Sequence, residues 1–595
     1  CMGLKMKSYK PIRIITVLVL VINLLILSGC NSTNGSLAES DGKNDSSSQS
    51  GATGLSIGFG KVDITPETPI QLRGQNYDRV ATSVKDPLYA TAVAMESDDS
   101  TMQAVIVSVD NIIVDSWGLI EAVRKYTDGK MEGFKDTTNI LCFATHTHTG
   151  PWSYTSEYFP PPGNVAMSGD DYQKWMASKV GDAAISAWND RKSGAVSSIV
   201  GQSETGWCRI ARFNNGKDTM YGDPNLSTFV EFISGNDHHL NLLYCYQGDE
   251  LKGVMLNPTF PFQSCETETE ISADITGRIR ERFPELYILP IISAAGDMSP
   301  YNTEKGSIGS QMGFANRDKY GDIISDEIEK YIKNGVAKEK REKKLVAEHL
   351  VKEIKVERTL QYGGSKLSVE LHALRLGKTV LVNNPFELYL DYGLAIKAKS
   401  TAEVTWIGQL SSNPYNYAGD CLYLPSKFAE EGGAYGAASS QVGSAGGAQL
   451  VKETTALINE IMKSGTTEVY DCVAGSDNIV TKGSCTEEHD AGAYGRSRTV
   501  MNEKGAAISF TFNGTGVKWY DSAGSDKGIA QIYIDGELYG ETDGYNSILL
   551  YQHEMLRITG LKDGEHTVKI VCTDEKSEAS SDCKVGADFF VTIKQ

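Results

Sequence analysis

The sequence predicts an α/β (α+β) domain with mixed sheets, followed by a separate all-β sandwich domain. From Leu55 onward, apolar strand-like runs alternate with amphipathic helical stretches as far as about residue 466. From residue 467 to the end, short β-rich runs replace the helices. A chain of 595 residues also exceeds the size of one ordinary domain. We therefore expect domains at 55–466 and 467–595.

The N-terminal segment 1–30 has the order of an export signal. Basic residues precede the apolar run Ile14–Leu27, and Leu27-Ser28-Gly29-Cys30 follows it. A cysteine directly after Leu-Ser-Gly resembles a bacterial lipoprotein signal, which implies that Cys30 is lipidated. The Ser-, Gly- and Asn-rich stretch 31–54 predicts a flexible tether. We expect an exported protein that is lipid-anchored to the membrane at the bacterial cell surface through Cys30.

The net charge limits the classes of binding partner, and the cysteine content limits the number of disulfide bonds. Lys and Arg number 57 against 76 Asp and Glu, and the net charge of −19 argues against nucleic acid as a partner. Eleven cysteines are few for a disulfide scaffold of this length. Four cysteines near the C-terminus would suffice for one or two bridges, with the pairing left open: Cys472, Cys485, Cys572 and Cys583.

The elements of the first domain follow from the spacing of apolar residues. Ala104–Val109 is a continuous apolar run, which is typical of a buried strand, and Asp170–Asn189 repeats apolar residues at helical spacing. The same criteria predict four further strands at Leu242–Tyr246, Val254–Leu256, Tyr287–Ser293 and Thr379–Val382. They also predict helices at Trp117–Tyr126, Asp318–Lys333 and Gln449–Lys463.

The second domain is predicted to consist of strands. Asp535-Gly536 between two such runs indicates a tight hairpin turn. The β-rich runs are Ala507–Phe512, Val517–Tyr520, Ala530–Ile534, His566–Cys572 and Phe589–Ile593.

The most informative stretch for chemistry is Asn139–Pro151, which reads N-I-L-C-F-A-T-H-T-H-T-G-P. Its apolar start predicts a buried strand, and His146 and His148 come at the end of that strand. Because residues i and i+2 of a strand share a face, an extended Thr145–Thr149 would direct both imidazoles the same way. Such a pair suits a metal site, or one ligand beside one proton shuttle. The alternative is a pair of surface or hydrogen-bonded histidines.

Four other stretches carry residues with catalytic potential, each with an ordinary alternative. Ser299 lies on a tight turn after an apolar strand, where it either faces a cleft or caps the turn. Glu387 follows a strand, as a site carboxylate or a solvated one. Tyr423 and Tyr435 flank a Gly-rich loop, where tyrosines often serve only in packing. Arg212 lies between apolar residues, and it either reaches inward or stays on the surface of a strand.

Taken together and in this order, these motifs resemble the neutral/alkaline ceramidase family, zinc amidases that hydrolyse the N-acyl bond of ceramide. The family's His-Thr-His-Ser-Gly-Pro motif is similar to His146–Pro151. Its other motifs are similar to the entry segment Gly58–Pro66, the turn Gly296–Asn302, the segment Pro385–Gly393, and Tyr423 with Tyr435–Ser439.

The resemblance implies roles for particular residues. Zinc ligand positions would be filled by His146, Glu387 and Tyr423, and the catalytic positions by His148, Ser299, Arg212 and Tyr435. A zinc-bound water would attack the amide carbonyl, and His148 would carry a proton to the leaving amine. Tyr435 and Arg212 would stabilise the oxyanion, while Ser299 would act as nucleophile or orient the substrate.

One position departs from the family pattern. The second zinc histidine of the family lies in a His-Pro-Thr/Ser segment, and here that segment reads Leu256-Asn257-Pro258-Thr259. An amide is a poor zinc ligand compared with a neutral imidazole. The sequence therefore allows three outcomes at the fourth metal position, Asn257. The metal is held weakly, it is held by a substitute such as Cys265 or Asp274, or it is lost.

The C-terminal domain resembles the galactose-binding-like sandwiches of glycan-active enzymes, through segments such as Gly516–Trp519 and Gly528–Gly536. This implies a possible glycan ligand, with Trp519 either stacked on a sugar or buried in the core. The sequence as a whole predicts a surface-anchored zinc-dependent amidase for ceramide or a related N-acylated lipid. The alternatives are a metal-free glycan- or lipid-binding protein, or a hydrolase of another linear amide or ester.

Overall fold

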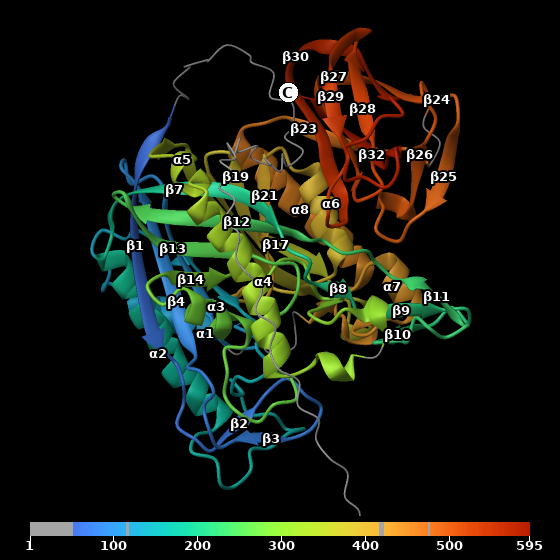
Figure 1. Cartoon of the computed structure of the whole chain (residues 1–595). Coiled ribbons are helices and arrows are strands. Elements are labelled where there is room, and N and C mark those ends of the chain that lie inside the picture. Colours follow the sequence, from blue (N-terminus) through green and yellow to red (C-terminus); the bar gives the residue numbers. More distant parts are fainter. Residues whose placement is uncertain (1–50, 115–117, 307, 416–421, 474–476, 595) are drawn as a thin grey trace, which may run out of the picture.

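The computed structural model describes residues 51–114, 118–306, 308–415, 422–473 and 477–594 (Figure 1). The predicted signal, the anchor at Cys30 and most of the tether lie outside these residues. The helices are α1 (Leu119–Thr127), α2 (Gly169–Asn189), α3 (Ile275–Arg282), α4 (Phe314–Lys333), α5 (Val336–Glu339), α6 (Leu390–Lys399), α7 (Lys427–Gly432) and α8 (Gly443–Met462).

A nine-stranded mixed sheet forms the centre of the first part of the chain. Its order is β14-β13-β12-β7-β1-β4-β5-β6, with β16 beside β1. Because β1 begins at Thr53, the last residues of the predicted tether belong to this strand. The strands are β1 (Thr53–Asp63), β4 (Tyr89–Ser97), β5 (Gln103–Val109), β6 (Ile140–Ala144), β7 (Lys192–Gln202), β12 (His239–Gln247), β13 (Glu250–Asn257), β14 (Tyr287–Pro290) and β16 (Lys344–Leu345).

A second, four-stranded sheet packs face to face against the first. An apolar layer lies between them, in which Phe59 and Phe143 of the large sheet belong to the same core as Leu374 and Trp406 of the small one. Helices α1 and α2 cover the outer face of the large sheet, and α8 covers β17 and β18 (Figure 1). The four strands are β17 (Ala347–Glu357), β18 (Lys366–Leu376), β19 (Thr379–Asn383) and β21 (Val404–Gly408).

Short strand pairs carry many of the residues singled out in the sequence. Two of these pairings bring distant segments together: β15 with β8, and β20 with β22. The short strands are β2 (Ile70–Leu72), β3 (Arg79–Ala81), β8 (Trp207–Cys208), β9 (Ile210–Phe213), β10 (Asp218–Met220), β11 (Phe229–Phe232), β15 (Met298–Ser299), β20 (Glu387–Leu388) and β22 (Tyr423–Leu424).

From Thr466 onward the described residues form two β-sheets, one of seven strands and one of three. The expected runs at 507–512 and 517–520 are parts of one long strand, β27. Asp535 and Gly536 both have positive φ, 51° and 89°, as a two-residue hairpin turn requires. The strands are β23 (Thr466–Asp471), β24 (Ile479–Lys482), β25 (Cys485–His489), β26 (Ser497–Met501), β27 (Ala507–Ala523), β28 (Ile529–Ile534), β29 (Glu537–Asp543), β30 (Leu550–Cys572), β31 (Val585–Ala587) and β32 (Phe589–Lys594).

The interior of this C-terminal part is apolar. Trp519 is buried with Phe510 and Phe590, and its indole N–H donates to the carbonyl of Gly586 at 3.2 Å. The tryptophan is therefore a core residue. The four C-terminal cysteines are free thiols, and none of the described residues forms a disulfide.

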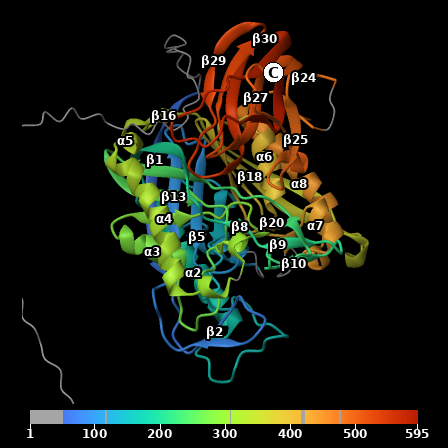
Figure 2. The ribbon, with the colours of Figure 1, turned by 45° about the vertical axis from the view of Figure 1, so that its right-hand side comes forward.

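The C-terminal strands pack onto the end of helix α6 (Figure 2). Ala398 of α6 shares a small apolar core with Tyr520 and Phe589. Beside it, the buried Lys518 ammonium group donates to the carbonyls of Ala398 and Ser400 at 2.8 and 2.9 Å. Burial lowers the pKa of Lys518 to about 7. A lysine is thus used to satisfy carbonyl groups that the end of a helix leaves without partners.

The predicted fold class is confirmed: mixed α/β sheets are followed by a β-rich C-terminal region. Within the described part of the chain, no helix is long and apolar enough to cross a membrane.

Candidate functional site

The two histidines come together through a turn, and the expected extended segment is wrong. β6 ends at Ala144, and His146 adopts a left-handed backbone with φ of 64°. Its backbone N–H donates to the carbonyl of Asn111 at 3.0 Å, which fixes the turn. The imidazole rings of His146 and His148 nevertheless lie edge to face, 4.9 Å apart between centroids. Both side chains are buried.

His146 is held in one tautomer. Its Nδ1 lies 2.8 Å from the carbonyl oxygen of Ile112, which can only accept, so Nδ1 carries the proton. Burial lowers the pKa of His146, which favours the neutral ring. Its Nε2 therefore presents a lone pair toward the Glu387 carboxylate, whose Oε2 is 3.7 Å away. This separation is too long for a hydrogen bond.

Glu387 and Tyr423 are direct neighbours in a parallel strand pair. The register of β20 and β22 places one opposite the other. Burial, and next the Glu387 carboxylate, raise the pKa of Tyr423 well above its usual value. The Tyr435 ring lies edge to face with Tyr423, at 5.1 Å between centroids, and Tyr435 is partly exposed. The pairing thus brings three of the predicted residues to one place.

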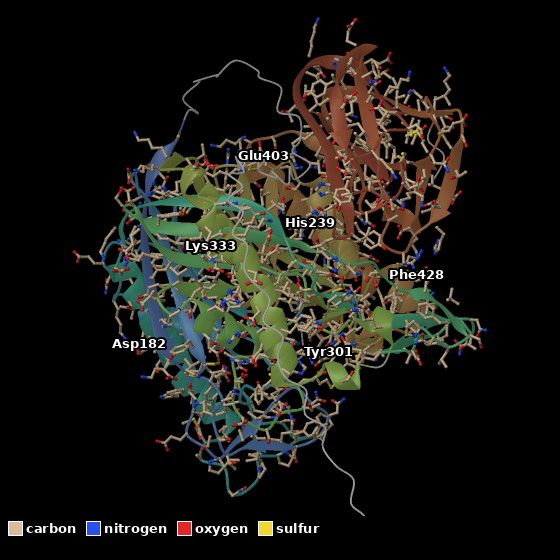
Figure 3. The ribbon with its side chains drawn as sticks, viewed as in Figure 1. Asp182, His239, Tyr301, Lys333, Glu403 and Phe428 are labelled. Atoms are coloured by element: carbon tan, nitrogen blue, oxygen red, sulfur yellow. The ribbon has the colours of Figure 1, made fainter. Side chains whose placement is uncertain are left out.

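The arginine at this place is Arg209, and Arg212 lies elsewhere. The Arg209 guanidinium donates to the Gly296 carbonyl at 2.8 Å and lies 5.9 and 5.8 Å from the ring centroids of Tyr423 and Tyr435. Arg212 instead forms an ion pair with Asp218 and donates to the carbonyl of Phe428, over whose ring it lies. Figure 3 shows Phe428 apart from Tyr301, whose hydroxyl donates to Glu266 beside His148.

Glu266, which the sequence pattern did not single out, adjoins His148. Its Oε2 lies 3.5 Å from His148 Nδ1, and its Oε1 accepts from the Tyr301 hydroxyl at 3.0 Å. Neither ring nitrogen of His148 has a hydrogen-bond partner within the described residues. Burial lowers the pKa of His148 well below its usual value and raises that of Glu266. We call the set of His146, His148, Arg209, Glu266, Glu387 and Tyr423 the histidine cluster.

Ser299 is fully buried in a short strand, where a turn was expected. Its β15 strand pairs with β8, and its hydroxyl accepts from the Tyr301 N–H at 3.2 Å. It connects to the histidine cluster through Tyr221. Burial, and next the charge of Glu266, raise the pKa of Tyr221 to about 12. Arg209 and Ser299 oppose that rise through hydrogen bonds.

Asn257 is engaged in a structural role. Its amide Nδ2 donates to the carbonyls of Ile291 at 2.6 Å and Ile407 at 2.9 Å, and its Oδ1 accepts from Asn241 at 3.3 Å. Of the proposed substitutes, Asp274 caps α3 by accepting from the backbone N–H groups of Ile275 and Cys265. Burial raises the pKa of Asp274 to about 7.

A metal ion at the histidine cluster would need a tyrosine ligand. In the part of the chain that the structure describes, no three His, Cys, Asp or Glu side chains are arranged to hold an ion. His146 and Glu387 offer one nitrogen and one carboxylate, and the Tyr423 phenol is the neighbouring third donor. Nitrogen and oxygen donors of this kind suit zinc.

Comparison by sequence gives short matches only, and no family model matches the chain. An A type blood N-acetyl-alpha-D-galactosamine deacetylase of Flavonifractor plautii is 34% identical over 95 residues, or 16% of this chain. An A type blood alpha-D-galactosamine galactosaminidase of the same organism is 36% identical over 109 residues, or 17% of this chain. The chain spans 12% and 10% of the length of these two curated proteins.

Comparison of structures gives matches over most of the chain. The crystal structure of neutral ceramidase from Pseudomonas aeruginosa aligns with 91% of this chain and 98% of its own, at a TM-score of 0.53 and 12% identity. A ceramidase complexed with C2 aligns with 91% and 99%, at a TM-score of 0.54 and 13% identity. The aligned share extends beyond residue 466 into the C-terminal strands. The chain therefore has the neutral ceramidase fold, as the sequence motifs predicted.

Proposed function

We propose that this chain is an amidase that hydrolyses the N-acyl bond of ceramide or a related N-acylated lipid, with one zinc ion at the histidine cluster. The neutral ceramidase fold supports this proposal. The single observation that carries it is the lone pair of His146 Nε2 facing the Glu387 carboxylate across 3.7 Å.

The donor geometry fits a shared cation. Two acceptor atoms that face each other in a buried place are unfavourable unless a proton or a cation lies between them. Ligand atoms at zinc distances on a tetrahedral ion stand roughly 3.3–3.6 Å apart, close to the observed separation. His146, Glu387 and Tyr423 would hold the ion. When bound, zinc would supply Lewis acidity and lower the pKa of a water molecule.

The side chains of the cluster would handle the proton and the carbonyl. A proton between His148 Nδ1 and Glu266 would fix the ring and leave Nε2 free to take a proton from water and pass it to the leaving amine. Arg209 would stabilise the negative charge that develops on the carbonyl oxygen, with Tyr435 at the exposed side. Ser299 already bonds to the backbone of Tyr301, which favours an orienting role over a nucleophilic one.

The test is metal content together with hydrolysis of a short-chain ceramide. We expect about one zinc per chain in the wild type, and loss of both zinc and activity in His146→Ala and Glu387→Gln. His489→Ala is the matched control, because this histidine is exposed on β25. A zinc-loaded protein that cleaves no N-acyl lipid would reject the amidase, and full activity in Glu387→Gln would reject the assignment of the ligands.

Asn257 favours a second candidate, a metal-free lipid- or glycan-binding protein. Because the Asn257 amide donates to backbone carbonyls, the cluster has one metal ligand fewer than the family pattern implies. An empty wild type that gains zinc in Asn257→His would support this candidate. Calorimetry with short-chain ceramide and with galactosides would then identify the ligand.

We also propose anchoring at the bacterial cell surface through lipidated Cys30 and a glycan ligand for the C-terminal strands, both from the sequence resemblance. Metabolic labelling with palmitate, abolished in Cys30→Ala, tests the anchor. Because Trp519 is buried, a sugar would have to contact other residues. A glycan array with the full chain tests this ligand.

A further inference from the structure

Arg73 lies beside His148 and has no role in the mechanism above. It follows β2, and its backbone N–H donates to the carbonyl of Gly150, two residues after His148, at 3.0 Å. The next residue, Gly74, packs directly on the imidazole: a Cβ there would lie 2.5 Å from the His148 Cγ. The backbone thus fixes the start of the Arg73 side chain against the histidine cluster.

The Arg73 guanidinium rests on aromatic rings and has no counter-ion among the residues that the structure describes. Its Cζ lies 5.1 Å from the Trp152 ring centroid and 4.7 Å from that of Tyr154. Such stacking holds a guanidinium without using its N–H groups. The Nη1 atom is buried without a hydrogen-bond partner, and no carboxylate among the described residues forms an ion pair with Arg73.

Two more arginines reinforce the positive charge. The Arg79 guanidinium donates to the backbone carbonyls of Arg73, His148 and Glu268, and Arg209 donates to that of Gly296. No ion pair joins either of them to a carboxylate in the described part of the chain.

The surrounding carboxylates offset part of the charge on Arg79 and Arg209, but none among the described residues pairs with Arg73. Glu266 and Glu387 are the acidic side chains of the cluster, and each faces a histidine. The buried Asp297 carboxylate also lies near Arg209, so Arg73 is the guanidinium of the three that the local carboxylates leave unpaired. Burying cationic groups without counter-ions is costly. A partly buried guanidinium without a counter-ion is suited to a ligand that brings negative charge.

Because Arg73 adjoins His148, which would pass a proton to the leaving amine, we infer that Arg73 binds an anionic group on the amine side of the substrate. Among related N-acylated lipids, the chain would then prefer N-acylated amino acids over ceramide. This inference rests on the proposed amidase function. In the reaction the C–N bond breaks, the hydroxyl of water adds to the acyl carbon, and the amine nitrogen takes a proton. The products are a fatty acid and an amino acid. A carboxylate or a sulfonate on the amine would meet the two N–H edges of the guanidinium.

The test compares two probes that differ only in charge, N-octanoylglycine and its neutral amide, N-octanoylglycinamide. Affinity is measured by calorimetry and cleavage by release of octanoate, with the zinc-loaded full chain. We expect the wild type to favour the anionic probe by about 10- to 100-fold, the range of one charge-assisted hydrogen-bond pair. Arg73→Gln should lose this preference and treat the neutral probe as the wild type does.

Two further variants complete the design. Arg341→Gln is the control, because Arg341 also lies over a tyrosine ring, that of Tyr246, but pairs with Asp249. It should keep the full preference. Arg73→Lys keeps the charge but loses the paired N–H edge, and it should retain part of the preference. It also serves as the folded variant if Arg73→Gln does not fold.

The outcomes separate this inference from the proposed function. Tight, Arg73-dependent binding of N-octanoylglycine, with cleavage of neither probe nor of short-chain ceramide, supports the anion site and rejects the amidase. Cleavage of both probes at equal rates supports the amidase and overturns the inference. A preference that survives in both Arg73 variants also overturns it.

Discussion

Replacing Asn257 with leucine should destabilise the fold and leave zinc content unchanged. The amide donates to the carbonyls of two fully buried residues, Ile291, directly after β14, and Ile407, within β21. Removing the donor from a buried carbonyl costs about 1–3 kcal/mol, and leucine recovers part of this through apolar contact. We therefore expect a loss of about 2–4 kcal/mol in the free energy of unfolding.

Urea unfolding followed by tryptophan fluorescence measures this loss. Asn257→Asp refines the test, because its carboxyl would face two carbonyl oxygens and can donate only when protonated. Its folded pKa would be raised, so its stability should fall as the pH rises from about 5 to about 8. Asn502→Asp, at an exposed position, controls for the added charge. A stability change below about 0.5 kcal/mol, or loss of zinc at unchanged stability, would refute the structural role and make Asn257 a ligand.

Two further predictions concern Lys518 and Gly74. Because burial lowers the pKa of Lys518 from 10.5 to about 7, the unfolded chain binds more protons between these values. The free energy of unfolding should therefore rise with pH in this window, by up to about 1.4 kcal/mol per pH unit. Lys518→Met should abolish the rise in urea unfolding at pH 7 to 9, and an unchanged slope would contradict the shift. Gly74→Ala should displace the His148 ring and lower the kcat for hydrolysis of short-chain ceramide by roughly 10-fold or more, without loss of zinc. Gly129→Ala is the control and should leave kcat unchanged, because φ is also positive there but no atom lies within 4 Å of the added Cβ.

The sequence predicted the fold well where local pattern determines structure. The continuous apolar run of β5 and the helical spacing of α2 specify their own conformations, and both lie within a residue of the predicted bounds. The break between 512 and 517 was not real, because the small residues there continue β27 with a register shift. A bulge of this kind depends on the partner strand, which the local sequence does not contain.

The candidate site was harder to predict, because its members meet only in three dimensions. Arg209 lies between β8 and β9 and Arg212 lies within β9, and nothing in the local sequence says which of the two reaches inward. Arg73 and Glu266 carry no motif, and their positions depend on contacts with distant segments. The proximity of His146 and His148 was expected for the wrong reason, since a left-handed turn produces it.

Helix α6 connects the histidine cluster to the C-terminal strands. Glu387 lies three residues before its first turn, and Lys518 closes its last carbonyls from the other part of the chain. A helix of ten residues is a rigid rod of about 15 Å. The β-rich part is thus a support for the carboxylate at the far end of this rod. A fragment cut after α8 would leave the end of the helix open to water and expose an apolar face. We therefore expect truncation to disturb α6 and, through this helix, the position of Glu387.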